Sequence, residues 1–161
     1  NSHWVCTGSN PPPVYNDRLW WFLSGRTACH GIRQPDSLKE IGVASGRVDG
    51  FASLTTTEQG GWIRTRPFLW PGGELGINAD TRRSMTMDPR FVSGEIRVEV
   101  LDENGAVMPG FSRDACQPFR RDNGIHTMAW TDKKMASLTG RTLALVFLMH
   151  DAHLYGFGNS A

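Results

Sequence analysis

The chain has 161 residues, of which 39% are hydrophobic and 20% charged, and this composition excludes an intrinsically disordered protein. Its 17 Lys and Arg residues nearly balance its 16 Asp and Glu residues, so the net charge of +1 argues against nucleic acid as a partner. The longest apolar run, Leu143 to Met149, is far too short to span a membrane as a helix. We therefore expect a globular protein with no nucleic-acid partner and no membrane span.

The predicted fold is all-β. Eighteen glycines and nine prolines interrupt the chain about every ten residues, which is typical of short strands joined by turns. The first strands form a hairpin, in which Trp4–Thr7 leads through a proline-rich loop to a return strand at Arg18–Ser24. The core of that return strand, Leu19–Leu23, is apolar on both faces and must be covered on both sides. With a short strand at Ile41–Ala44, the hairpin is interpreted as a remnant of a larger sheet.

We place a domain boundary near Gly46, which separates an N-terminal hairpin (1–46) from an antiparallel, jelly-roll-like β-sandwich (47–161). The strongest strand signal is Glu95–Val100, where apolar and charged residues alternate, followed by an Asn104-Gly105 turn and a returning Ala106–Met108. A helical turn is predicted within Thr131–Thr139, with Asp132 and Ser137 as its caps. The remaining predicted strands are Phe51–Leu54, Trp62–Arg66, Glu74–Ala79 and Leu143–Met149.

The three cysteines leave two alternatives open. Cys6 and Cys29 flank the predicted hairpin and could form a disulfide, which would leave Cys116 free. Alternatively, all three are reduced and buried, because free cysteine is among the most buried residue types.

No complete catalytic set or cofactor motif is visible, so we expect no cofactor. His150 and His153 have a spacing seen in metal sites, but they lie at a strand end and we predict no metal there. No motif singles out a pair of carboxylates for acid–base chemistry.

Six tryptophans suggest a different chemistry, because exposed aromatic rings stack on the apolar faces of sugars. Trp70, beside Pro71-Gly72-Gly73, is the ring we expect to be displayed, and Arg64 and Arg66 would donate to a polyhydroxylated or acidic sugar. The alternative for the two arginines is a plain solvated strand face. The tryptophans assigned to the core are Trp20, Trp21, Trp62 and Trp130.

A series of short motifs, in order along nearly the whole chain, resembles the C-terminal end of proteins of glycoside hydrolase families 32 and 43. The motifs are Ile41–Ala44, Arg47–Leu54, Gly73–Leu75, Asn78–Asp80, Val98–Asp102, Pro109–Ser112 with Asp114 and Cys116, Leu138–Arg141 and Ala152–Phe157. Such proteins carry a β-propeller followed by a β-sandwich.

The resemblance implies that 16–31 is the end of the last propeller blade. It also implies that the catalytic carboxylates lie in earlier blades, so that no catalytic residue can be assigned here. His30 and Arg26 would occupy rim positions facing the propeller centre. The stretch Thr81–Phe91 is longer than the turn expected from the resemblance, and such an insertion could serve a partner.

These observations predict a non-catalytic accessory module of a glycosidase-like protein, which packs on a carbohydrate-active propeller domain and binds glycan. The alternative is an assembly subunit whose apolar strands at Leu19–Leu23 and Leu143–Met149 are covered by a partner chain. An autonomous glycosidase is disfavoured by the absent motifs. The resemblance and the Cys6–Cys29 pair favour secretion, and a start at Asn1 without an initiator Met suggests a cleaved or excised product.

Overall fold

The computed structural model describes residues 4–7, 11–27, 39–82 and 94–160. The described chain is all-β and antiparallel, and its one helical element there is a 3₁₀ turn, η1 (Met135–Leu138). No helix in these ranges is long and apolar enough to cross a membrane. The chain divides into two compact units, Asn1–Phe51 and Ala52–Ala161. The predicted boundary at Gly46 lies inside a strand, because that strand stays paired as far as Arg47.

The N-terminal unit is a four-stranded sheet. Its central strand β3 pairs with β1 and β2 along one side and with β4 along the other. The predicted hairpin of Trp4–Thr7 with the strand from Arg18 is confirmed. Asn16 and Asp17 link β2 to β3 with positive φ at both residues, as a two-residue type I′ turn requires. The strands are β1 (Trp4–Thr7), β2 (Val14–Tyr15), β3 (Arg18–Arg26) and β4 (Lys39–Arg47).

Apolar side chains occupy both faces of this small sheet. Phe22 and Val43 are direct cross-strand partners and share one face with Ile41, which is 87% exposed. On the other face, the Trp21 ring meets the Phe51 ring edge to face at a centroid distance of 6.1 Å. The Trp21 ring also covers Gly46, where an added Cβ would lie 2.9 Å from it. Two sheet faces therefore carry apolar groups that remain partly in contact with water.

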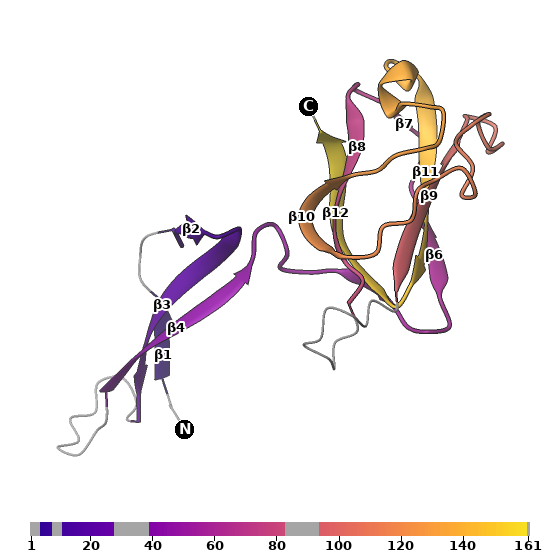
Figure 1. Cartoon of the computed structure of the whole chain (residues 1–161). Coiled ribbons are helices and arrows are strands. Elements are labelled where there is room, and N and C mark those ends of the chain that lie inside the picture. Colours follow the sequence, from indigo (N-terminus) through magenta and orange to yellow (C-terminus); the bar gives the residue numbers. More distant parts are fainter. Residues whose placement is uncertain (1–3, 8–10, 28–38, 83–93, 161) are drawn as a thin grey trace. The chain divides into compact units, whose positions relative to one another are not determined.

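The second unit is a sandwich of two antiparallel sheets, seen as two layers in Figure 1. One sheet has the order β10-β8-β12-β5, and in the other β11 pairs with β6 and β7 along one side and with β9 along the other. Its strands are β5 (Leu54–Thr56), β6 (Gly61–Arg64), β7 (Phe68–Leu69), β8 (Glu74–Asp80), β9 (Glu95–Leu101), β10 (Asp122–Thr127), β11 (Thr142–His150) and β12 (Ala152–Ser160).

The core lies between these sheets. Ile96, Val98 and Val100 of β9 are fully buried while their charged neighbours are half-buried, so the predicted alternation is confirmed. The predicted return after Asn104-Gly105 is also confirmed, because the Met108 N–H donates to the Val100 carbonyl at 2.9 Å. The other buried side chains include Leu75, Ile77, Leu143, Leu145, Phe147 and Leu154.

Two local predictions were wrong. The strand expected at Phe51–Leu54 begins only at Leu54, because its partner β12 pairs with Leu54–Thr56. The helical turn is shorter than predicted and has no side-chain cap at its start. The Ser137 hydroxyl instead donates to the Lys134 carbonyl at 2.7 Å, so neither Asp132 nor Ser137 acts as an N-cap.

Candidate functional site

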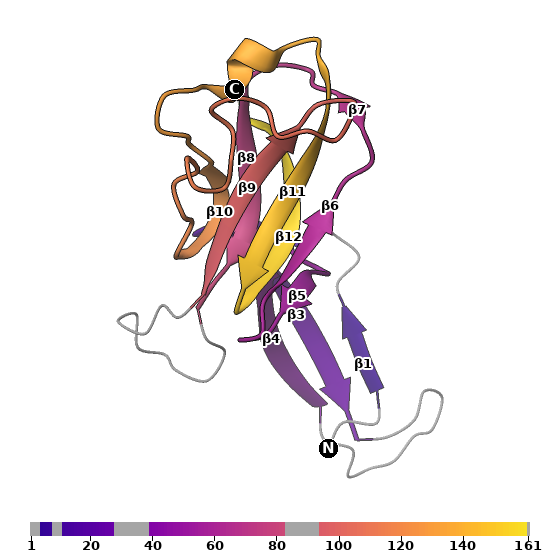
Figure 2. The same ribbon diagram turned by 90° about the vertical axis from the view of Figure 1, so that its right-hand side faces the viewer.

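Strand β6 is an edge strand with two chemically different faces. Among the described strands it pairs only with β11, opposite Val146–Met149. Ile63 packs against the core, so by strand alternation Trp62 and Arg64 point to the outer face of the sheet. Figure 2 shows β9, β11 and β6 side by side, with β6 at the margin. We call this surface the Trp62 face, defined by Trp62 and Arg64 on the outer side of β6 together with exposed Arg66 just beyond the strand.

Trp62 is displayed on this face. Its side chain is 69% exposed. Its cross-strand neighbour is Leu148 on β11, which in turn lies opposite Arg97 on β9. Leu148 and Arg97 are half-buried. The indole therefore continues a row of side chains that crosses the sheet from β9 to β6.

Arg64 begins the next row, opposite Val146, which lies opposite Glu99. The Arg64 guanidinium reaches over the turn after β9, where Nη2 is 3.2 Å from the position of a Cβ built on Gly105. Arg66 follows just beyond the end of β6 and is exposed. Within the described part of the chain, no ion pair involves Arg64 or Arg66.

The carboxylates of the same sheet already have partners. Glu95 accepts hydrogen bonds from Arg97 at 3.1 Å and from Arg120 at 2.6 Å. Partial burial would raise the pKa of Glu95, but these two guanidinium groups outweigh it and hold that pKa below its usual value. Glu99 accepts a hydrogen bond from the backbone N–H of Arg113 at 3.3 Å. The positive charge at Arg64 and Arg66 is therefore not matched by a contacting carboxylate in the described residues.

The structure reverses the predicted roles of two tryptophans. Trp70, predicted to be displayed, is only 1% exposed, and its indole N–H donates to the Gly73 carbonyl at 3.3 Å. The loop of Pro71-Gly72-Gly73 does not expose this ring because the backbone of Trp70 is bonded on both sides, to Arg141 and Gly140. Trp62, predicted to be core, is exposed instead. The signal that identifies it was present in the sequence, since Trp62 lies two residues before Arg64 on a strand.

The other predicted core tryptophans differ in burial. Trp130 is buried and its indole N–H donates to the Val98 carbonyl at 3.2 Å. Trp20 and Trp21 are half-buried in the N-terminal sheet.

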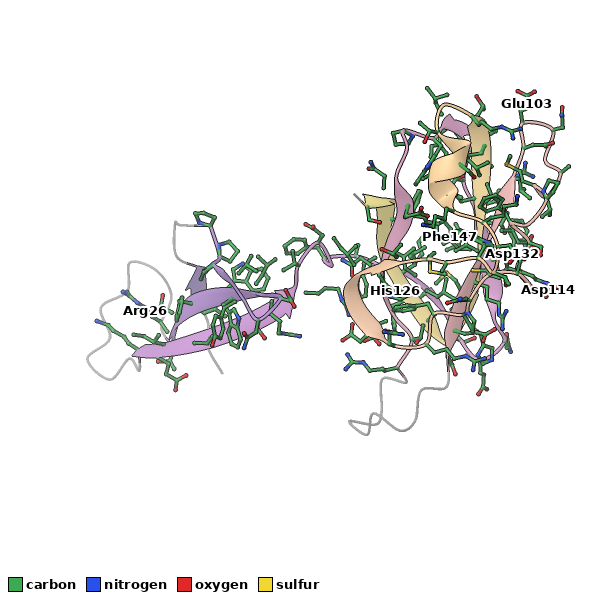
Figure 3. All side chains as sticks on the ribbon, turned by 45° about the horizontal axis from the view of Figure 1, so that its top comes forward. Arg26, Glu103, Asp114, His126, Asp132 and Phe147 are labelled. Atoms are coloured by element: carbon green, nitrogen blue, oxygen red, sulfur yellow. The ribbon has the colours of Figure 1, made fainter. Side chains whose placement is uncertain are left out.

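Several predicted site residues lie outside the Trp62 face. Arg26 is exposed at the end of β3 in the N-terminal unit (Figure 3). His30, Cys29, the side chain of Cys6 and most of the stretch Thr81–Phe91 lie outside the described residues, so the rim position of His30 and the Cys6–Cys29 disulfide stay predictions. Cys116 is free and buried.

The two histidines considered for a metal lie on either side of the β11–β12 turn. His153 Nδ1 lies 2.9 Å from the Thr55 hydroxyl oxygen, in hydrogen-bond contact. Among the residues that the structure describes, no three His, Cys, Asp or Glu side chains are grouped so that they could hold a metal ion.

A pocket opens between the edge strands β5 and β6, on the inner side of β6. This pocket has a volume of about 310 Å³ and is mostly apolar. Its floor includes Phe147 and Phe157, whose ring centroids are 5.0 Å apart, and Phe147 lies between the two sheets in Figure 3. The pocket walls include Leu54, Ile63 and Leu154.

Comparisons of this chain with family models, with curated proteins and with solved structures give no significant match.

Proposed function

We propose that this protein is a non-catalytic accessory β-sandwich module that packs on a carbohydrate-active domain and binds glycan through the Trp62 face. The observation that carries the proposal is the 69% exposed Trp62 indole on the outer surface of a sheet. A single exposed apolar side chain is common on protein surfaces, but an exposed indole on the same strand face as a guanidinium combines the two groups that a sugar can use, a stacking ring and hydrogen-bond donors. An indole on a flat strand surface suits the apolar C–H face of a pyranose ring.

The neighbours of Trp62 support a polar ligand over an apolar one. Arg64 provides guanidinium N–H donors on the same face, and Arg66 follows it along the chain. Sugar hydroxyls and ring oxygens accept such hydrogen bonds, and a guanidinium presents several donors in fixed directions. Stacking and hydrogen bonding would therefore act on one ligand together.

The resemblance to glycoside hydrolase families 32 and 43 supports the accessory role, because it assigns the catalytic carboxylates to propeller blades. The N-terminal sheet supports packing on such a domain, since Phe22, Val43 and Ile41 form an apolar face that a neighbouring sheet would cover. A secreted protein would meet extracellular glycans, which is the location we propose.

The test is affinity electrophoresis of the full chain in gels that contain neutral or acidic polysaccharides. We expect the wild type to be retarded by at least one of them, and Trp62→Ala to weaken that binding at least about tenfold. Phe51→Ala is the matched control, because Phe51 is also an exposed aromatic residue but lies in the N-terminal unit. Unchanged binding by Trp62→Ala, with native near-ultraviolet circular dichroism, would exclude the proposed site.

A second candidate function is an assembly subunit that needs no ligand. The exposure of Phe22 (61%) and of Ile41 on one sheet face favours it. It predicts that the chain sediments as an oligomer and that Phe22→Ser with Ile41→Ser returns it to a monomer. An assembly that forms while no polysaccharide binds would favour this candidate over the glycan module.

A further inference from the structure

We infer that the Trp62 face selects acidic polysaccharides and that Arg64 and Arg66 bind the carboxylates of uronic-acid residues beside the one stacked on Trp62. The inference rests on the proposed function, because it names the ligand class of the same face.

The first step is the order of the groups along the chain. A strand rises about 3.3 Å per residue, so Trp62 and Arg64 lie about 7 Å apart along β6, and exposed Arg66 follows two residues after the strand ends. The stacking ring and the Arg64 guanidinium lie on one side of β6 at the margin of the sheet, and Arg66 adds a second exposed guanidinium just beyond the strand. A polysaccharide that lies along β6 would place one sugar on the indole and carry its next substituents past the arginines.

The second step is charge. Every carboxylate on the outer side of β9 is already bonded, Glu95 to Arg97 and Arg120 and Glu99 to the Arg113 backbone. Arg64 and Arg66 have no ion-pair partner within the described ranges. Two unmatched cations beside an exposed indole are complementary to a ligand that carries both sugar rings and carboxylates.

The third step is the geometry of the cation. A guanidinium binds a carboxylate through two parallel N–H groups, whereas it makes weaker single hydrogen bonds to hydroxyls. An acidic sugar therefore gains more from this face than a neutral sugar of the same shape. Because the arginines are exposed, the gain will be screened by salt.

The experiment compares two forms of one backbone, polygalacturonate and highly methyl-esterified pectin, by isothermal titration calorimetry with the full chain. We expect polygalacturonate to bind about tenfold more tightly in dilute buffer and the preference to fall as sodium chloride is added. Arg64→Gln with Arg66→Gln should weaken binding of polygalacturonate about tenfold and binding of the esterified form much less, because a glutamine amide still donates to hydroxyls but carries no charge for a carboxylate, so the preference is lost. Arg121→Gln is the control, since this exposed arginine precedes β10 in the opposite sheet.

The outcomes separate the inference from the function it rests on. Equal binding of both forms, lost in Trp62→Ala and unaffected by the arginine variants, would overturn the uronate assignment and leave a glycan module. Binding of both forms that survives Trp62→Ala would overturn the proposed function as well. Dextran sulfate that binds more tightly than polygalacturonate would overturn the uronate assignment in favour of sulfate groups.

Discussion

The backbone N–H of Val98 donates a hydrogen bond to the Sγ atom of Cys116 at 3.3 Å, inside the core of the sandwich. Burial raises the pKa of the Cys116 thiol, although this N–H and the nearby Arg97 act in the opposite direction. Since the thiolate is the reactive form, we expect Cys116 to resist alkylation in the native protein. Iodoacetamide labelling at pH 8, followed by peptide mass spectrometry, should modify Cys116 in urea and leave it nearly unmodified without urea. Labelling of Cys116 at equal rates in both conditions would contradict its buried position.

Trp70→Ala should strongly destabilise the sandwich. The substitution removes a fully buried indole, its hydrogen bond to the Gly73 carbonyl and its edge contact with the Phe68 ring at 6.3 Å. Large-to-small changes of this kind cost about 3–5 kcal/mol. Trp62→Ala should change the free energy of unfolding by about 0.5 kcal/mol or less, because Trp62 is exposed. Urea denaturation of both variants measures the contrast, and similar losses would refute the assignment of one ring to the core and one to the surface.

Gly73 and Gly140 offer a matched pair for separating backbone strain from steric overlap. Their φ angles are 76° and 77°, in the left-handed region that favours glycine. A Cβ at Gly73 would lie 2.6 Å from the Ser160 carbonyl oxygen, whereas a Cβ at Gly140 would meet nothing within 4 Å. We expect Gly140→Ala to lower the free energy of unfolding by about 1–2 kcal/mol and Gly73→Ala to lower it by at least about 1 kcal/mol more.

Urea denaturation measures the free energy of unfolding of both variants. Equal decreases would contradict the expected difference and would mean that Ser160, at the end of β12, moves away from the new Cβ at little cost. A smaller loss for Gly73→Ala would contradict the close approach of β8 and β12.

His126 should make the fold less stable in mild acid. Burial lowers the pKa of His126, and the nearby Arg121 charge lowers it further. The unfolded chain, with a histidine pKa of about 6.5, then binds a proton before the folded chain does. Above about pH 6.5 this histidine therefore does not change the free energy of unfolding. As the pH falls through about 6.5 and on through the lower pKa of the folded state, the free energy of unfolding decreases. The urea midpoint of the wild type should fall more steeply between pH 7.5 and 5 than that of His126→Gln. Parallel pH profiles would refute this origin.

The sequence predicts the fold well where apolar and polar residues alternate clearly. In β9, Ile96, Val98 and Val100 alternate with charged residues, and a one-residue slip of the pairing register would turn all three away from the core. The bounds of β5 were not predictable from its own residues, because they depend on which residues β12 offers for pairing almost 100 positions later along the chain. Local propensity carries no information about such a partner.

The candidate site shows the same limit. Alternation correctly associates Arg64 with an exposed strand face and places Trp62, two residues earlier, on the same face, but tryptophan is highly buried on average, and this general tendency led to its assignment to the core. Pairing with β11 decides the orientation, by placing Ile63 opposite Phe147. For Trp70 the neighbouring Pro71-Gly72-Gly73 signals a loop correctly, but the burial of the ring depends on tertiary structure, in which the Trp70 backbone is hydrogen-bonded to Gly140 and Arg141.

The brevity of β5 and β6 bears on how the protein behaves at high concentration. Among the described residues, both strands leave one row of backbone groups unpaired, and when such open edges are long they recruit further strands into fibrils. β6 has four residues, ends at Arg64 and is followed by Thr65, Arg66 and Pro67, so the same edge of a second copy would meet like charge and then a residue without an N–H. The arginines proposed to recognise an acidic ligand would therefore also act as gatekeepers against edge-to-edge aggregation.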